Sequence, residues 1–338
     1  MDRSSFVTAA ISLALFVVAP LAVADNIPLS SLNLVSTGTN TTELIDGGTV
    51  LQLTPNYDTN SGSPVAPAGA AWTPTTVNVA KGFSVNFQFE ISDPCLTGLP
   101  TCVNDNGHGG DGIAFLIQDS SPTALGLGAG GMGFLGITDS VAVMFDTYQN
   151  SSPDYYGDPS NNYIAINTRG TDFNVPHHYC TYVPSVGAYE LTADPSLPSD
   201  LTGSSFSPYC NGTNPTLAMT GGGSTFGNWA ALNPVTQDLD SGVHDVGITY
   251  NGSVMDVYLD SELVLSAAID LGTLLDLQGG TNAYLGFTAG DRYAYQNQDI
   301  LSFSETPIPE PAWSQLWIAL IGLLAMGLAR KWQRARRW

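Results

Sequence analysis

The stretch VAVMFDTYQNSSPDYYGDPSNNYIAI, residues 141–166, is the most informative part of this chain. An apolar strand runs directly into side chains at alternate positions, Asp146, Tyr148 and Asn150, and another carboxylate, Asp158, follows a short loop. In an extended chain, residues i and i+2 project to the same face. One strand end can therefore present a carboxylate, an amide and a nearby backbone carbonyl to a hard cation such as Ca²⁺. The alternative is an ordinary turn, which Asp and Asn also favour.

Segments on both sides of this stretch have the pattern of strands. In GFSVNFQFEIS (82–92) apolar and polar residues alternate, and in VGITYNGSVMDVYLD (246–260) two such runs meet at Asn251-Gly252, a strong hairpin signal. Further apolar strands are predicted at 112–118, 140–145, 162–167 and 282–289, and one or two helical turns at 271–277. Residues 25–305 are therefore predicted to form one all-β domain, a β-sandwich or jelly roll.

Residues 170–240 have a different composition, rich in Ser, Gly, Thr, Asn and Pro, and we predict long surface loops there. His177 and His178 lie in this region, either as a metal-binding pair or as an ordinary surface pair, which a polar loop favours. The four cysteines fit an oxidising compartment. Pairing Cys95 with Cys102 and Cys180 with Cys210 is the simplest of three possible connectivities.

Both ends of the chain have the composition of export signals. Residues 1–24 combine a basic start, an apolar run and a small-x-small cleavage site, which predicts a secretory signal peptide. At the other end, Pro309-Glu310-Pro311 precedes an apolar segment, 314–329, predicted to be a single hydrophobic helix, and a basic tail, 330–338.

This C-terminal arrangement, within residues 306–338, resembles the PEP-CTERM sorting signal of Gram-negative bacteria. The resemblance implies transient insertion in the inner membrane, recognition by an exosortase, removal of the tail, and export to the cell surface or extracellular matrix. A permanent single-span anchor is the alternative, because the apolar segment is close to the minimum length of a membrane span.

The net charge of the chain restricts its partners. The full sequence carries a formal charge of −21, and removing both end segments leaves three basic residues against 28 acidic ones, a net charge near −25. Such a surface repels polyanions and tolerates cations. Nucleic acid is therefore excluded as a partner.

Several segments resemble, in order, the legume-lectin (L-type lectin) family, whose fold is a concanavalin-like β-sandwich. They are GGDGIAFLIQ (109–118), GAGGMGFLGI (128–137), SVAVMFDTYQN (140–150), GDPSNNYIAI (157–166), and the closing segments 244–260 and 282–304. The resemblance spans most of residues 25–305 and covers 170–240 poorly. It implies a carbohydrate-binding protein and not an enzyme, and it also allows a homodimer.

The resemblance assigns a role to each residue of the opening stretch. Asp146 and Asp158 would give carboxylate oxygens to Ca²⁺, Asn150 its side-chain oxygen, and Tyr148 its backbone carbonyl. The link between Asn150 and Asp158 is longer than the family's usual link, which leaves Asp154 as a competitor for the fourth position.

The sugar would lie beside this metal. The resemblance implies that Asp111, held by a cis peptide after Gly110, accepts hydrogen bonds from sugar hydroxyls. Asn150 and the backbone N–H of Gly131 would donate to the same sugar. Tyr148 or Tyr155 would form an aromatic floor, and Asp291 and Arg292 lie in the loop where the family varies its specificity.

Two positions depart from the family pattern. Met144 and Tyr163 stand where the family has a glutamate and a histidine, the carboxylate and imidazole ligands that suit Mn²⁺. We therefore predict that the second, Mn²⁺ site is absent or altered.

The expected function is Ca²⁺-dependent binding of a glycan or exopolysaccharide outside the cytoplasm. The first alternative is a structural or adhesive matrix protein with a degenerate sugar site. The second is a glycoside hydrolase on the same fold, which needs two appropriately spaced carboxylates. The Glu-x-Asp-x-x-Glu run of the sandwich hydrolases does not occur in this sequence.

Overall fold

The computed structural model describes residues 24–37, 42–56, 66–95, 107–150, 158–176, 180–183, 188–191, 216–219 and 236–307. Residues 24–307 make up one compact unit. Across these described segments, no helix has the length and apolarity needed to cross a bilayer. Residues 1–23 of the predicted signal peptide and the C-terminal segment from residue 308 onward lie outside the described residues.

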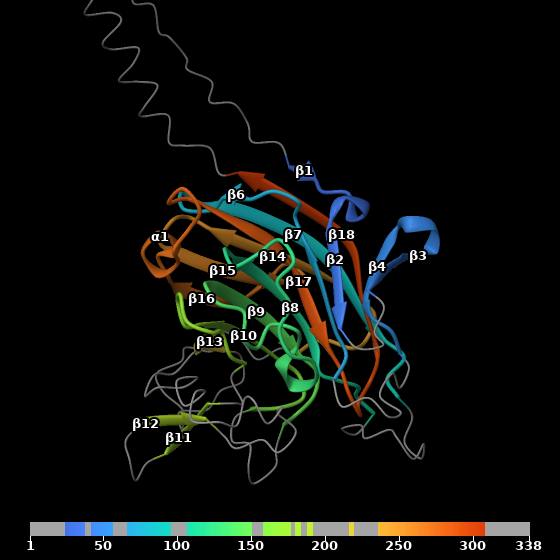
Figure 1. The fold of residues 1–338 in the computed structure, drawn as a ribbon. Helices are drawn as coiled ribbons and strands as arrows, with labels where there is room; N and C mark the ends of the chain where they lie inside the picture. The colour runs from blue at the N-terminus through green and yellow to red at the C-terminus, as the bar shows by residue number, and fades with distance from the viewer. Residues whose placement is uncertain are drawn as a thin grey trace, which may run out of the picture. The chain divides into compact units, whose positions relative to one another are not determined.

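Two large antiparallel sheets form the sandwich (Figure 1). The front sheet has the order β13 (Thr216–Met219), β10 (Tyr163–Thr168), β9 (Ser140–Asp146), β8 (Gly112–Gln118), β17 (Asn282–Gly290), β5 (Ala68–Trp72) and β2 (Asn33–Thr37), with β6 (Val77–Asn78) on β17. The back sheet has the order β16 (Glu262–Ala268), β15 (Val254–Leu259), β14 (Val243–Tyr250), β7 (Phe83–Ser92), β18 (Asn297–Pro307), β4 (Val50–Thr54) and β3 (Glu43–Ile45), with β1 (Asp25–Asn26) on β18.

The remaining elements are short. Strands β11 (Cys180–Val183) and β12 (Ala188–Leu191) pair with each other within the loop-rich region. The helical turns are η1 (Leu29–Ser31), η2 (Asp46–Gly48), η3 (Ala129–Gly131) and α1 (Leu271–Leu274). The all-β sandwich is therefore as the sequence predicts, including the helical turn within 271–277.

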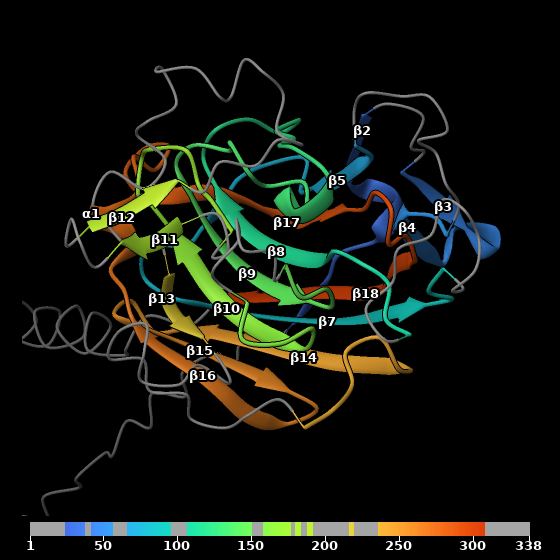
Figure 2. The same cartoon turned by 90° about the horizontal axis from the view of Figure 1, so that it is seen from below.

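Aromatic side chains from both sheets fill the space between the two layers. Figure 2 shows the two layers one above the other. Phe87 of β7 and Phe303 of β18 meet Phe287 of β17 with ring centroids 5.0 and 4.9 Å apart. Phe115 and Phe145 of the front sheet lie 5.8 and 6.0 Å from Phe87. Such rings contribute much of the free energy of folding, because each removes a large apolar area from water.

A second apolar cluster covers the outer face of the front sheet. It includes Trp72, Leu116, Met132, Phe134 and Met144, partly from the loop that joins β8 to β9. Strands β8 and β9 are consequently buried on both faces. This explains why their sequences are continuously apolar, whereas β7, with one face exposed, alternates.

The structure tests only part of the predicted disulfide pairing. Cys95 is disulfide-bonded. Cys102 and Cys210 lie outside the described residues, as do His177 and His178. The pairings Cys95–Cys102 and Cys180–Cys210 therefore stay predictions.

Candidate functional site

Strand register brings the predicted site residues to one end of the front sheet. On neighbouring antiparallel strands, Asp146 pairs with Gly112 on one side and with Tyr163 on the other. Gly112 also pairs with Gly290 of β17. The segments that enter or leave these strands at this end therefore lie together, and they carry Asp111, Asn150 and Asp291.

Among the buried side-chain oxygens at this end that lack a hydrogen-bond partner, two belong to predicted Ca²⁺ ligands. Asp146 is fully buried, and its Oδ1 accepts a hydrogen bond of 3.0 Å from the N–H of Tyr148. Its Oδ2 and the Oδ1 of Asn150 are buried without a hydrogen bond. A buried acceptor left unsatisfied costs about 1–3 kcal/mol. These two oxygens therefore fit the donor set of an oxygen-ligated cation.

Asp158 is held beside them by two hydrogen bonds. Its Oδ2 accepts a bond of 2.8 Å from the backbone N–H of Asn150, and its Oδ1 accepts a bond from the hydroxyl of Tyr163. Asp158 is 9% exposed. The competing residue Asp154 lies outside the described residues, as does Tyr155.

The electrostatics of this cluster favour a bound cation. Burial, followed by the neighbouring Asp158 carboxylate, raises the pKa of Asp146 well above its ordinary value, and Asp111 adds to the shift. The hydrogen bond from the Tyr148 N–H and the nearby Tyr163 hydroxyl oppose the shift. The raised pKa means that this pocket disfavours the carboxylate form unless positive charge is supplied.

Asp111 stands next to this cluster, and the peptide bond between Gly110 and Asp111 is cis, as the resemblance implies. Backbone atoms of Asp111 anchor it to two neighbours: its N–H donates to the carbonyl of Gly290 at 2.9 Å, and its carbonyl accepts from the N–H of Thr147 at 3.1 Å. The residue is 6% exposed. The backbone of Asp111 is thus held by main-chain contacts with the ends of both neighbouring strands.

Close packing explains two of the glycines around Asp111. A Cβ atom at Gly110 would lie 2.8 Å from the Cβ of Tyr148, so the Tyr148 side chain packs directly against this backbone. Gly112 has a φ of +132°, and a Cβ there would lie 2.2 Å from the carbonyl oxygen of Phe145. Only glycine fits both requirements at this position.

The glycine-rich loop approaches the site through Gly290. A Cβ at Gly290 would lie 2.9 Å from the carbonyl oxygen of Ala129 and 3.0 Å from the Cα of Met132. The N–H of Gly131 donates to the carbonyl of Gly128 at 3.0 Å. Gly131 can therefore serve a sugar only as a shared donor, a restriction that the sequence does not reveal.

The two residues predicted in the specificity loop differ in their surroundings. Asp291 is 1% exposed, and its carbonyl accepts a hydrogen bond of 3.1 Å from Ala129 N–H. The guanidinium of Arg292 lies 4.9 Å from the ring centroid of Tyr293, which is 52% exposed. Arg292 and Tyr293 therefore form the outward-facing part of this loop.

Comparison with known families identifies the family of this domain. The model of the legume lectin domain matches residues 29–315. The chain belongs to the legume lectin domain family. It is therefore a carbohydrate-binding lectin and not an enzyme.

Solved structures with a similar fold include plant and luminal lectins. The basic winged bean lectin, solved with Tn-antigen, is 20% identical with a TM-score of 0.49, covering 86% of this chain and 100% of that one. Lectin II from Ulex europaeus is 18% identical with a TM-score of 0.47, covering 84% and 97%. The VIP36 luminal domain, solved with Ca²⁺ and Man3GlcNAc, is 15% identical with a TM-score of 0.44, covering 84% and 88%. Because these identities and TM-scores are low, the assignment of the chain to the legume lectin family rests on the family model.

The structure shows the surroundings of Met144 and Tyr163, the two residues that depart from the family's metal-ligand pattern. Met144 packs in the second apolar cluster. Tyr163 is fully buried, and its hydroxyl donates to Asp158. Neither residue offers a carboxylate or an imidazole, and the prediction of an absent or altered Mn²⁺ site stays a prediction.

At a Ca²⁺ site that includes Asp158, replacing Tyr163 by phenylalanine is expected to weaken Ca²⁺ binding about tenfold, because residues that orient metal ligands typically contribute 10–100-fold to affinity. Calorimetric titration with Ca²⁺ measures the effect. Tyr250→Phe is the matched control, since Tyr250 is also buried and its hydroxyl accepts from the Leu271 N–H at 3.0 Å in the back sheet. Equal Ca²⁺ affinity in Tyr163→Phe and the wild type would show that Asp158 is not a ligand oriented by this hydroxyl.

Some supporting residues of the lectin site were not predicted from the sequence. The Gln298 amide donates to the carbonyls of Gly110 and Gly290, each at 3.2 Å, and the Gln296 amide donates to the Thr147 hydroxyl at 2.7 Å. These bonds connect the end of β18 to both segments that carry the site. The only sequence signal is two glutamines in YAYQNQ, which is too common a pattern to interpret.

A separate group of titratable side chains lies next to the Gly109-Gly110 turn. His108 Nδ1 is 2.9 Å from Asp240 Oδ2 and 3.6 Å from Asp238 Oδ1. Burial and a hydrogen bond with Asp238 raise the pKa of Asp240 to about 6, although His108 opposes the shift. The spacing would allow a metal ion. The hydrogen bond between His108 and Asp240 ties the Asp111 turn to the segment before β14.

Proposed function

We propose that this lectin is an exported protein that binds a glycan or exopolysaccharide in a Ca²⁺-dependent manner. Asp146, Asn150 and Asp158 supply side-chain oxygens to Ca²⁺, and Tyr148 supplies its backbone carbonyl. The observation that carries the proposal is the pair of buried, unsatisfied oxygens, Asp146 Oδ2 and Asn150 Oδ1, beside Asp158. A hard cation satisfies both and compensates the mutual repulsion of the carboxylates.

The bound ion also has a consequence for the sugar. Asn150 would give its side-chain oxygen to Ca²⁺, which leaves its NH₂ group as a donor for a sugar hydroxyl. Asp111 has a carboxylate that accepts hydrogen bonds from hydroxyl groups. A donor and an acceptor placed together match the two roles of adjacent sugar hydroxyls, with Asp291 and Arg292 at the edge of the site.

The end segments support export of the lectin. Residues 1–24 fit a secretory signal, and residues 306–338 fit a PEP-CTERM signal for an exosortase in a Gram-negative bacterium. The mature protein would then lie at the cell surface or in the extracellular matrix. The intact mass of the exported protein tests this proposal, because both end segments should be missing.

A glycan array probed with the purified protein, first in Ca²⁺ and then in EGTA, tests the proposed function. The expected result is binding to a defined set of glycans that disappears in EGTA. Binding that persists in EGTA and is lost in Asp111→Ala would contradict the Ca²⁺ dependence of this site. An absence of binding under both conditions would favour the alternative, a structural or adhesive matrix protein with a degenerate sugar site.

A further inference from the structure

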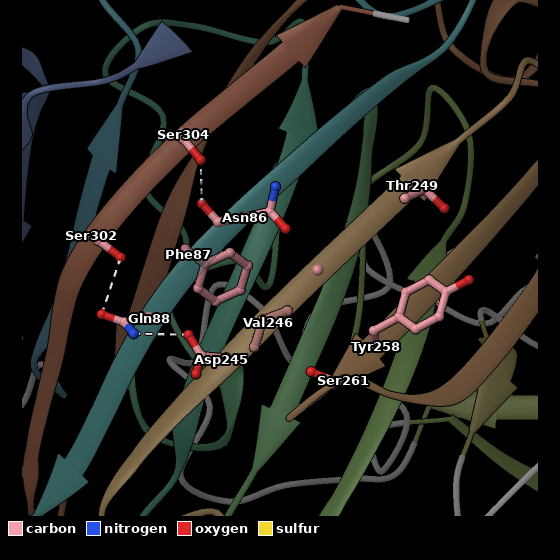
Figure 3. Close-up of a pocket in the computed structure, with 11 residues that line it drawn as sticks. Asn86, Phe87, Gln88, Asp245, Val246, Thr249, Tyr258, Ser261, Ser302 and Ser304 are labelled. Carbon is pink, nitrogen blue, oxygen red and sulfur yellow. Dashed lines mark hydrogen bonds between the residues drawn. The ribbon is translucent and has the colours of Figure 1, made fainter. Parts of the chain in front are cut away.

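The outer face of the back sheet carries a groove of about 560 Å³ on the layer opposite the site described above. It crosses four adjacent strands, β15, β14, β7 and β18 (Figure 3). Its lining includes Asn86 and Gln88 from β7, Asp245 and Gly247 from β14, and Tyr258 from β15.

Strand alternation makes this groove polar. Phe87 and Val246 belong to the core, so their side chains point away from the groove. The side chains that point outward are amides, hydroxyls, one carboxylate and one phenol ring. Asn86 and Asp245 are exposed, and Gln88 and Tyr258 are half-buried.

A glycine creates the hollow in the middle of the groove. Gly247 pairs with Asn86 on one side and with Tyr258 on the other. A Cβ at Gly247 would lie 3.4 Å from Asn86 Oδ1 and 3.7 Å from Tyr258 Cβ, both ordinary contacts. The fold therefore does not require glycine here. Its effect is to leave room between an amide and an aromatic ring.

Some polar groups of the groove are already hydrogen-bonded to the protein, and others are available to a ligand. Gln88 Nε2 donates to Asp245 Oδ1 at 2.8 Å, which fixes the Gln88 amide in place. Within the described residues, neither the Asn86 side chain nor the Tyr258 hydroxyl makes a hydrogen bond with the protein. A ligand here thus meets fixed donors and acceptors, two groups available for hydrogen bonding, and an aromatic face.

This chemistry matches a neutral polyhydroxylated chain. The lining includes no Lys or Arg, and Asp245 is its single ionisable acid, so an anionic ligand has no counter-charge. The chain's net charge of −21 also repels anions. A second copy of the lectin is a poorer match, because the cores of homodimer interfaces are apolar and depleted of charge.

We propose that this groove is a second carbohydrate site, which binds a neutral polysaccharide independently of Ca²⁺ and of Asp111. The four strands are spaced about 4.8 Å apart, so the groove runs for roughly 14 Å and suits a segment of a chain rather than one sugar ring. The two sites on opposite sheets would let one lectin molecule connect two polysaccharide chains.

Affinity electrophoresis of the full chain through native gels containing dextran, mannan or laminarin tests the proposal in EGTA. The Asp111→Ala variant should still be retarded by at least one of the three polysaccharides. Adding Gly247→Thr to this variant should reduce the affinity at least fivefold, because the threonine side chain fills the hollow while suiting a strand. Asn86→Ala should also reduce retardation without touching the core.

Ser84→Thr is the matched control, because Ser84 lies on the outward side of β7 outside the groove and gains a similar methyl group. It should leave retardation unchanged. The proposal is overturned if no polysaccharide retards Asp111→Ala, or if Gly247→Thr has no effect in that background. A dimer seen by sedimentation velocity in the wild type and lost in Gly247→Thr would also overturn it, in favour of a second copy of the chain. The glycan array tests the front-sheet site, which depends on Asp111 and Ca²⁺, and the electrophoresis in EGTA tests the groove. Failure of one site can therefore be distinguished from failure of the other.

Discussion

Replacing Asp111 by alanine is expected to abolish glycan binding at the front-sheet site while leaving the fold intact. Each hydrogen bond to a charged group contributes about 1.5–3 kcal/mol, so the loss of two corresponds to a fall in affinity of about 100-fold or more. The contacts that hold residue 111 to Gly290 and Thr147 are made by backbone atoms, which alanine keeps. Calorimetric titration with a glycan identified on the array, in Ca²⁺, measures the loss.

The melting temperature of Asp111→Ala should match the wild type or exceed it slightly, because the substitution removes a carboxylate that repels Asp146. Asp172→Ala is a suitable control, since it also removes one carboxylate but from the exposed residue at position 172. Glycan affinity retained by Asp111→Ala in Ca²⁺ would show that another residue accepts the sugar hydroxyls.

Replacing Asp146 by asparagine is expected to have opposite effects with and without Ca²⁺. In EGTA the variant should melt at a higher temperature than the wild type, because it no longer buries a carboxyl group whose pKa is raised by desolvation and by Asp158. In Ca²⁺ the wild type should gain about 5–10 °C, since a ligand at 100 times its Kd stabilises by about 2.7 kcal/mol. Asp146→Asn should show no such gain.

The pH dependence follows from the same raised pKa. A carboxyl whose pKa is higher in the folded state destabilises that state as pH rises from its unfolded pKa through its folded pKa. The Ca²⁺-free wild type should therefore lose stability as pH rises above about 4, whereas Ca²⁺ affinity should rise over the same range. Asp146→Asn should lack this contribution. Thermal melts between pH 4 and 8, with and without Ca²⁺, test both signs.

Asp299→Asn provides the matched control for this experiment. Burial raises the pKa of Asp299 to about 6, and the residue lies on β18 of the back sheet. Its substitution should also stabilise the lectin at neutral pH, because it removes another buried carboxylate. The gain in melting temperature on adding Ca²⁺ should nevertheless remain. Loss of that gain in Asp299→Asn would contradict the location of the Ca²⁺ site.

The sequence predicts the fold well because burial is visible in the residue pattern. The strict alternation of 83–92 appears as β7 with one buried face. The apolar runs predicted at 112–118 and 140–145 appear as β8 and β9, buried on both faces. The cluster of Asp146, Asn150 and Asp158 is local in sequence, so short-range reasoning could find it.

Other features depend on strand register between distant segments and could not be found this way. The Gln298 bond to Gly110 spans 188 residues, and the Gln296 bond to Thr147 spans 149. The groove at Gly247 needs four strands from three parts of the chain to be aligned. The hydrogen bond that occupies the Gly131 N–H arises from the local turn of η3, which glycine-rich sequence alone does not specify.

The central claim is that a Ca²⁺ ion at Asp146, Asn150 and Asp158 enables sugar binding at Asp111. Its most direct test is the affinity of the wild-type lectin for one array-identified glycan, measured by calorimetry in Ca²⁺, then in EGTA, and again after Ca²⁺ is restored. We predict binding in Ca²⁺, no measurable binding in EGTA, and full recovery on restoration. Equal affinity in Ca²⁺ and in EGTA would contradict the claim.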